Sequence, residues 1–97
     1  MDHLTWLGWW RDGGRAALEA QLLAHWDPLD VRDDPARHAE YARTAMRLAG
    51  RLRNGAGAGH LADVLAAANR ELGVRVNERQ LWAVATEIEG WYRREGP

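Results

Sequence analysis

The residue types that most often carry out catalysis are either missing from this sequence or spaced in no known catalytic arrangement. Neither cysteine nor serine is present, so most covalent-nucleophile mechanisms lack their usual residue. Its four histidines follow no metal-ligand spacing, such as HExxH or a pair four residues apart on a helix; they are His3, His25, His38 and His60. We therefore expect histidines scattered over the surface, no metal site and no cofactor.

Paired carboxylates and closely spaced glycines do not indicate catalysis either. The pair Asp33-Asp34 falls at a predicted helix cap, and Glu87 and Glu89 fall on outward helical positions, where solvated side chains are expected. The glycines in residues 55–59 follow no strand and precede no lysine, so a phosphate-binding loop is not indicated. The sequence thus predicts that the protein is not an enzyme.

Three tryptophans near the N-terminus form the clearest candidate binding feature. Trp6, Trp9 and Trp10 are spaced to share one face of a short helix, which Gly13-Gly14 then breaks or bends. Tryptophan is strongly enriched at the energetic centres of protein interfaces. Two interpretations remain open: the three rings bind a protein partner, or they fold back to cover the rest of the chain.

A stripe of arginines is the second candidate surface. Arg43, Arg47 and Arg51 recur every four residues and therefore share one helical face, where they would bind an acidic partner or phosphates. The alternative is a solvated face paired with Glu40. Because the chain carries 13 basic and 14 acidic residues, for a net charge of -1, no overall field attracts nucleic acid.

The elements that must position these residues are all predicted to be helices. No segment alternates apolar and polar residues as a strand does, whereas several have apolar residues three and four apart. We expect Asp2 to cap an N-terminal tryptophan helix, and four main helices to follow near residues 15–26, 35–53, 60–72 and 77–95. The second main helix is expected to start with Asp34 as its cap and to bury Tyr41, Ala45, Leu48 and Leu52, with Met46 and Ala49 alongside.

Length and patterning predict one small domain. Ninety-seven residues suffice for a single core, and short links between the helices favour an antiparallel helical bundle of four main helices, with residues 1–13 as a candidate N-terminal arm. No apolar run approaches the ~20 residues of a membrane span, and the first residues lack a signal-peptide pattern. We expect a cytoplasmic protein that does not bind membranes.

One short motif resembles that of a known family. Residues 26–31 read WDPLDV, and Glu40-Tyr41 follows at the start of an alanine-rich helix. This pattern resembles a family of small bacterial all-helical proteins of unknown function, whose signature is a Trp-Asp-Pro-Ile/Leu-Gly-Val turn and a Glu-Tyr motif. Members of that family lack an established activity, and some resemble immunity proteins that neutralise a toxin. The resemblance covers about residues 18–73 and implies that Trp26, Asp27, Pro28 and Tyr41 occupy the motif positions.

The residue types favour a structural role for these motif positions. Trp26 continues the apolar stripe of the preceding helix, Pro28 ends that helix, and Asp27 is placed to bond backbone in the turn. Tyr41 is expected to be buried, with its hydroxyl hydrogen-bonded; a candidate partner is the turn that contains Asp27. Asp30 stands where the family pattern has glycine, and aspartate is one of the few other residues that tolerate a positive φ angle.

These observations lead to one main hypothesis and two alternatives. The leading hypothesis is a non-enzymatic interaction module, immunity-like or accessory, that binds one protein partner through the tryptophan segment and adjoining helix faces. The alternatives are nucleic-acid binding through the arginine stripe, and a small-molecule site in an aromatic pocket lined by Trp82, Trp91 and Tyr92. A homodimer is also open, because the same tryptophans would bury equally well against a second copy.

Overall fold

The computed structural model describes residues 2–97, so Met1 of the expected arm lies outside the described residues. Two helices joined by a bend form the N-terminal part: α1 spans His3–Trp9, a π-helical turn spans Trp10–Gly14, and α2 spans Arg15–His25. The carboxylate of Asp2 accepts a hydrogen bond from the Thr5 N–H at 2.8 Å, which confirms the predicted cap of α1. Gly13 has a φ of 150°, a backbone conformation that side-chain-bearing residues rarely adopt, and the helix axis bends there.

The chain then makes an irregular turn before the next helices. A short 3-10 helix spans Pro35–Tyr41 and leads directly into α3, Ala42–Arg53. The expectation of one α-helix from residue 35 to 53 with an Asp34 cap is wrong in its first part. The Asp34 side chain makes no capping bond; instead the Asp34 carbonyl accepts from the Arg37 N–H at 2.9 Å, the three-residue spacing of a 3-10 turn.

The last two helices form a hairpin. Helix α4 spans Ala58–Glu71 and α5 spans Glu78–Glu95, and between them lies the most extensive helix-to-helix contact of the fold. Asn77 caps α5 as predicted, because its side chain accepts from the Gln80 N–H at 3.1 Å. Gly57, at the start of α4, has no capping side chain; Glu89 of α5 accepts from the Ala58 N–H at 3.0 Å and fills that role.

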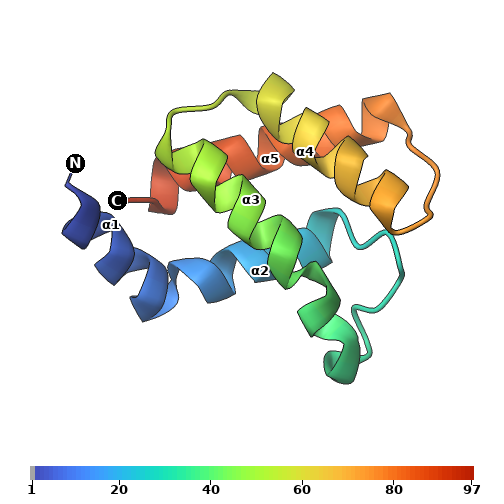
Figure 1. Ribbon diagram of the computed structural model, residues 1–97, viewed down its shortest axis with the longest axis horizontal. Coiled ribbons are helices and arrows are strands. Elements are labelled where there is room, and N and C mark those ends of the chain that lie inside the picture. The colour runs from blue at the N-terminus through green and yellow to red at the C-terminus, as the bar shows by residue number, and fades with distance from the viewer. Residues whose placement is uncertain (1) are drawn as a thin grey trace.

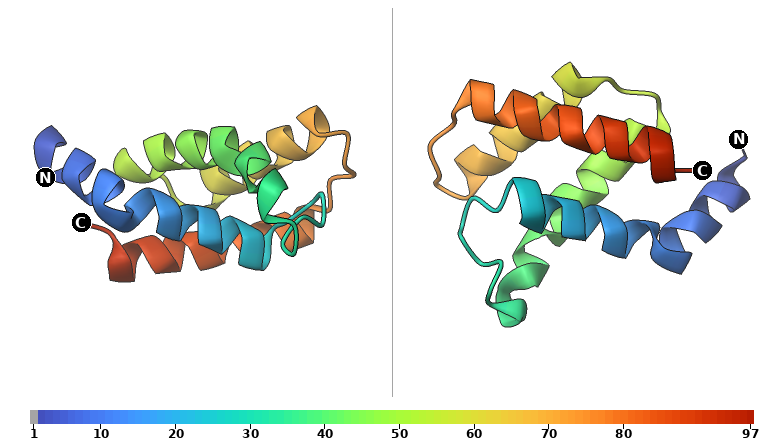
Figure 2. Two further views of the ribbon diagram at one scale, coloured as in Figure 1. Left: turned by 90° about the horizontal axis from the view of Figure 1, so that it is seen from below. Right: turned by 180° about the vertical axis from the view of Figure 1, so that it is seen from behind.

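The helices pack in two layers. Helices α2 and α5 lie side by side and run in opposite directions, while α3 crosses α2 obliquely and lies with α4 on one side of that pair (Figures 1 and 2). Helix α1 lies beside the C-terminal end of α5, whereas the turn after α2 lies at the opposite end of the molecule (Figure 1). The prediction of an all-α fold is confirmed, and none of the described helices is long and apolar enough to span a membrane.

The core is formed by the apolar stripes of the four longer helices. Its fully or nearly fully buried members include Leu18 and Leu22 of α2, Ala45, Leu48 and Leu52 of α3, Leu61, Leu65 and Ala68 of α4, and Leu81, Val84, Ala85 and Ile88 of α5. Met46 is an exception to the prediction, since its side chain is 55% exposed. The reason is geometric. Side chains two positions apart on an α-helix point about 200° away from each other, so Met46 points away from the core that Leu48 enters.

Candidate functional site

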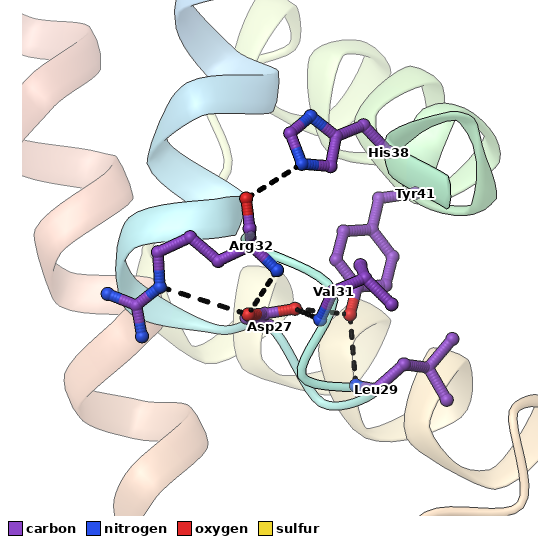
Figure 3. A network of polar contacts seen from close by, with 6 residues as sticks. All are labelled: Asp27, Leu29, Val31, Arg32, His38 and Tyr41. Carbon is purple, nitrogen blue, oxygen red and sulfur yellow. Dashed lines mark hydrogen bonds and ion pairs between the residues drawn. The ribbon is translucent and has the colours of Figure 1, made fainter. Parts of the chain in front are cut away.

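The WDPLDV stretch folds into a turn that is organised around one carboxylate. Atom Oδ1 of Asp27 accepts from the Val31 N–H at 2.9 Å and from the Tyr41 hydroxyl at 2.7 Å, and Oδ2 accepts from the Arg32 N–H at 3.0 Å (Figure 3). The Asp27 side chain is 7% exposed, and the Arg32 guanidinium lies 4.0 Å from Oδ2. The carboxylate therefore replaces backbone partners for a segment that has left the helix.

Tyr41 closes this network from the 3-10 helix. Its hydroxyl donates to Asp27 and accepts from the Leu29 N–H at 2.9 Å, so both of its hydrogen-bonding functions are used (Figure 3). The Tyr41 ring packs on the Trp26 ring with 4.9 Å between the centroids, and both side chains are buried. The Trp26 Nε1–H donates to the Asn69 side chain at 2.8 Å, and Asn69 donates to the Arg75 carbonyl at 3.1 Å. The turn is thereby fastened to α4 and to the link that follows it.

Two aspartates in the turn adopt left-handed backbone conformations. Asp27 has a φ of 35° and Asp30 a φ of 55°. Glycine would adopt the angle at Asp30 without strain. Aspartate takes such angles more readily than most residues, so the turn forms without the glycine.

The electrostatics of the network favour a fixed, ionised carboxylate. Burial raises the pKa of Asp27, but hydrogen bonds from the Val31 N–H, the Tyr41 hydroxyl and the Arg32 N–H outweigh it and hold the pKa below the usual value. Burial, followed by the hydrogen bond to Asp27, raises the pKa of Tyr41. Both groups thus keep their charge state at neutral pH while bonding their own chain, which is an arrangement for holding a turn and not for transferring a proton.

The N-terminal tryptophans pack on their own chain. Trp6 stacks on Trp10 with 5.5 Å between the ring centroids and meets the edge of Trp9 at 5.7 Å. Trp9 also contacts Trp91 and Tyr92 of α5, at 6.1 and 5.6 Å. Of the two interpretations of these residues, the structure places the rings against the rest of the chain.

Polar bonds fix the cluster in place. The Trp6 Nε1–H donates to the Tyr92 hydroxyl at 3.0 Å, and the Trp9 Nε1–H donates to the Glu95 carbonyl at 3.2 Å. The guanidinium of Arg53 lies 5.4 Å from the centre of the Trp6 ring and contacts the His3 ring. Trp6 is buried, whereas Trp9 and Trp10 are half-buried.

The opposite face of α1 is apolar and uncovered. Leu4 is 79% exposed and Leu7 is 39% exposed. Leu4 lies about 200° around the helix from the buried Trp6, and Leu7 lies about 60° from Leu4, which agrees with its lower exposure. The three tryptophans were the predicted contact residues of this segment, and Leu4 and Leu7 were not; the signal for the leucines was a short helix with apolar residues on both faces.

The arginine stripe is only partly engaged. Arg47 forms an ion pair with Glu71 of α4, with Nη1 at 3.1 Å from one carboxylate oxygen and 3.2 Å from the other. Arg43 and Arg51 are exposed and form no ion pair with the described residues. The exposure of Arg43 and Arg51 agrees with the alternative interpretation, a solvated face paired with Glu40, but Glu40 pairs with Arg37 at 3.0 Å, three residues away on the 3-10 helix.

Open grooves lie on the surface of the described residues. One of them, about 710 Å³, lies between α3 and α4 and is lined by Arg47, Arg51, His60, Asp63, Val64, Ala67 and Glu71. A second, about 440 Å³, lies beside the tryptophan cluster and includes Trp91 in its lining; a third, about 470 Å³, lies between α4 and α5 and includes the exposed Trp82. The three aromatic residues expected to line one pocket are therefore not brought together. Trp91 and Tyr92 belong to the tryptophan cluster, and Trp82 lines a separate groove.

Two polar residues outside these surfaces, His38 and Asn69, contact other parts of the chain. His38 contacts the Arg32 carbonyl at 3.0 Å, and no three histidine or acidic side chains of residues 2–97 are grouped to hold a metal ion. Asn69 was also missed by the sequence analysis. Asn69 is a polar residue next to Ala68 of the buried stripe, and a polar side chain in that position indicates a buried hydrogen-bond partner.

Comparison with models of protein families, with curated proteins and with solved structures finds no match for this chain.

Proposed function

We propose that this protein is a non-enzymatic interaction module, immunity-like or accessory, that binds one protein partner through the outer face of α1. The scaffold for this role is an antiparallel arrangement of four main helices with the tryptophan helix docked at one end. The observation that carries the proposal is the exposure of Leu4, at 79%, on a helix whose other face is already packed against its own chain.

A helix that is apolar on both faces normally has both faces buried. Helix α1 buries Trp6 on one side and presents Leu4 and Leu7 on the other. Full burial of one leucine side chain contributes about 1.5–3 kcal/mol, so covering these two supplies a useful part of a binding energy. Because Trp6 and Trp9 hold α1 in place, a partner would bind a surface that is already ordered.

This assignment changes the role of the tryptophans. In the proposal Trp6, Trp9 and Trp10 position α1, and the leucines of the outer face contact the partner. Deleting residues 1–11 would remove the buried Trp6 together with the outer face. Loss of binding after that deletion would not separate the two roles, so point substitutions are needed.

The test is a double variant, Leu4→Gln with Leu7→Gln, compared with Trp82→Gln as a control. Trp82 is also an exposed apolar side chain, but it lies on α5. The tagged full-length proteins are used to capture a partner from native lysate, and the affinity of the purified partner is then measured by calorimetry. We expect the double variant to lose binding by at least about tenfold, which is 1.4 kcal/mol, while the control retains it. Equal affinity of the double variant and the unaltered protein would refute the assignment to α1.

A further inference from the structure

Helix α3 carries an unusual concentration of positive charge. Residues 42–53 include Arg43, Arg47, Arg51 and Arg53 and no acidic residue. Since the whole chain has a net charge of -1 and this helix contributes +4, the remaining residues carry -5. The positive field of α3 is thus a local feature of one helix on an otherwise acidic protein.

Two of the four arginines are free to bind something outside the chain. Arg53 lies over Trp6, and Arg47 is held by Glu71. Arg43 and Arg51 are exposed and unpaired among the described residues. Arginines spaced by four residues lie about 6 Å apart along a helix, so the stripe from Arg43 to Arg51 extends over about 12 Å.

An apolar side chain and an open backbone position lie next to these charges. Met46 is 55% exposed, and Gly50, one turn further on, is exposed with no atom within 4 Å of the position a Cβ would take. Residues three and four apart are neighbours on a helix surface, so Met46 adjoins Arg43 and Gly50, and Arg47 adjoins Arg43, Gly50 and Arg51. Methionine and arginine are both enriched in protein interfaces relative to the remaining surface.

We propose that the outer face of α3, formed by Arg43, Met46, Arg47, Gly50 and Arg51, binds an acidic segment of a second protein. Its carboxylates pair with Arg43 and Arg51, and an apolar side chain of the same segment covers Met46 beside the open backbone at Gly50. This α3 face is a second surface, separate from the outer face of α1, and it does not depend on the function proposed above.

The chemistry of the surroundings favours an acidic protein over a nucleic acid. Asp63 and Glu71 line the groove beside the arginine stripe and would repel a continuous phosphate backbone. The exposed Met46 lies among the arginines, where a sugar-phosphate chain has little apolar surface to offer. A short acidic segment needs only Arg43, Arg51 and Met46, and can leave Asp63 uncovered.

The test uses defined probes with the full-length protein: an amphipathic peptide of glutamate and leucine, poly-L-glutamate, and duplex DNA. Binding sites are mapped by backbone amide chemical shifts at low and at physiological salt. One variant is Arg43→Gln with Arg51→Gln, and its control is Arg75→Gln with Arg79→Gln, which makes the same change of charge at two exposed arginines outside α3.

We expect the glutamate-leucine peptide to shift amides of α3 and to bind more tightly than poly-L-glutamate, because only the former covers Met46. Affinity should fall at least about tenfold in the Arg43/Arg51 variant and much less in the control. Gly50→Gln provides a steric test. The added Cβ has no atom within 4 Å apart from its own stretch of helix, and glutamine favours the helix, so the variant should fold at least as well yet bind the peptide more weakly.

The proposal is overturned if the peptide leaves α3 unperturbed or if the control variant weakens binding equally. It is also overturned if duplex DNA binds the same residues more tightly than the peptide, which would identify a nucleic-acid surface. The Leu4/Leu7 variant should bind the peptide normally, so failure here and failure of the α1 assignment are distinguishable.

Discussion

Replacing Asp27 with asparagine tests the turn network more directly than any other substitution. Asparagine is nearly the same size and also tolerates the positive φ of 35° found at this position, so the backbone need not change. The substitution removes the negative charge and turns one of the two acceptor oxygens into a donor. The carboxylate at present accepts three hydrogen bonds, from Val31, Arg32 and Tyr41.

The magnitude follows from those three bonds. If the amide oxygen takes the place of Oδ1, it keeps the Val31 and Tyr41 donors, and the new NH₂ group faces the Arg32 N–H at 3.0 Å, where no hydrogen bond can form. One hydrogen bond to a charged group, worth about 1.5–3 kcal/mol, is lost, and the other two become neutral and weaker. We expect a total loss of about 2–4 kcal/mol, moderated because water can reach the exposed Arg32 N–H.

The assay is urea unfolding of the two proteins across a pH series. At pH 7 the midpoint should fall by about 1–2 M urea, given the slopes usual for small domains. The pKa of Asp27 is lowered in the folded protein, so its contribution to stability is complete above the unfolded pKa, near 4, and is lost as the pH falls through the folded pKa. The difference between the proteins should therefore be constant from pH 7 down to about pH 5 and shrink below about pH 4.

Two results would contradict this reasoning. A change in the free energy of unfolding below about 0.5 kcal/mol at pH 7 would mean that the three hydrogen bonds are replaced by water without cost. A large difference that stays constant down to pH 2 would mean that the loss does not depend on the charge of Asp27. The remaining carboxylates titrate in both proteins and cancel in the comparison.

Three further substitutions test the other contacts by the free energy of unfolding. Gly14→Ala should destabilise by about 1–3 kcal/mol and alter the tryptophan fluorescence, because the new Cβ would lie 2.8 Å from the Trp9 ring; unchanged stability would show that Trp9 moves freely. Asp30→Val should cost about 1–2 kcal/mol at a φ of 55°, whereas Asp30→Gly should be nearly neutral; equal effects would argue against a strained backbone. Trp26→Phe should cost about 1–3 kcal/mol, because it leaves the buried Asn69 oxygen without its donor. If Trp26→Phe costs as much when it is made in the Asn69→Leu protein, where that oxygen is absent, the loss has another cause.

The local parts of the fold could be predicted from the sequence. Asp2 and Asn77 are caps because a side-chain acceptor precedes an apolar helical pattern, and both bonds form. The helical class follows from apolar spacing alone, and Pro28 explains why α2 ends at His25. These features depend on residues within a few positions of each other, and such short-range effects can be predicted from residue types and their spacing.

Contacts between distant segments could not be predicted. Glu89 of α5 caps α4, and the residues around Gly57 do not predict that a side chain so distant in the sequence will do so. The pairing of Arg47 with Glu71 instead of Glu40 depends on how α3 lies against α4. The sequence also did not decide whether Trp6 packs on its own chain or on another. The pattern of α1 predicts an apolar face but not which residues cover it, and the contact with Tyr92 of α5 is distant in the sequence.

The contacts that stabilise this protein and the surfaces proposed to bind partners involve different residues. Asp27 and Tyr41 hold the end of α2, and Trp9 packs on Gly14 at its start, so α2 is fixed at both ends. The outer faces of α1 and α3 take no part in either cluster: Leu4 and Met46 are 79% and 55% exposed, and Arg51 forms no ion pair among the described residues. Stability and binding should therefore be separable: Asp27→Asn should lower the free energy of unfolding and leave the peptide affinity of the folded molecules unchanged, whereas Arg43→Gln with Arg51→Gln should do the reverse.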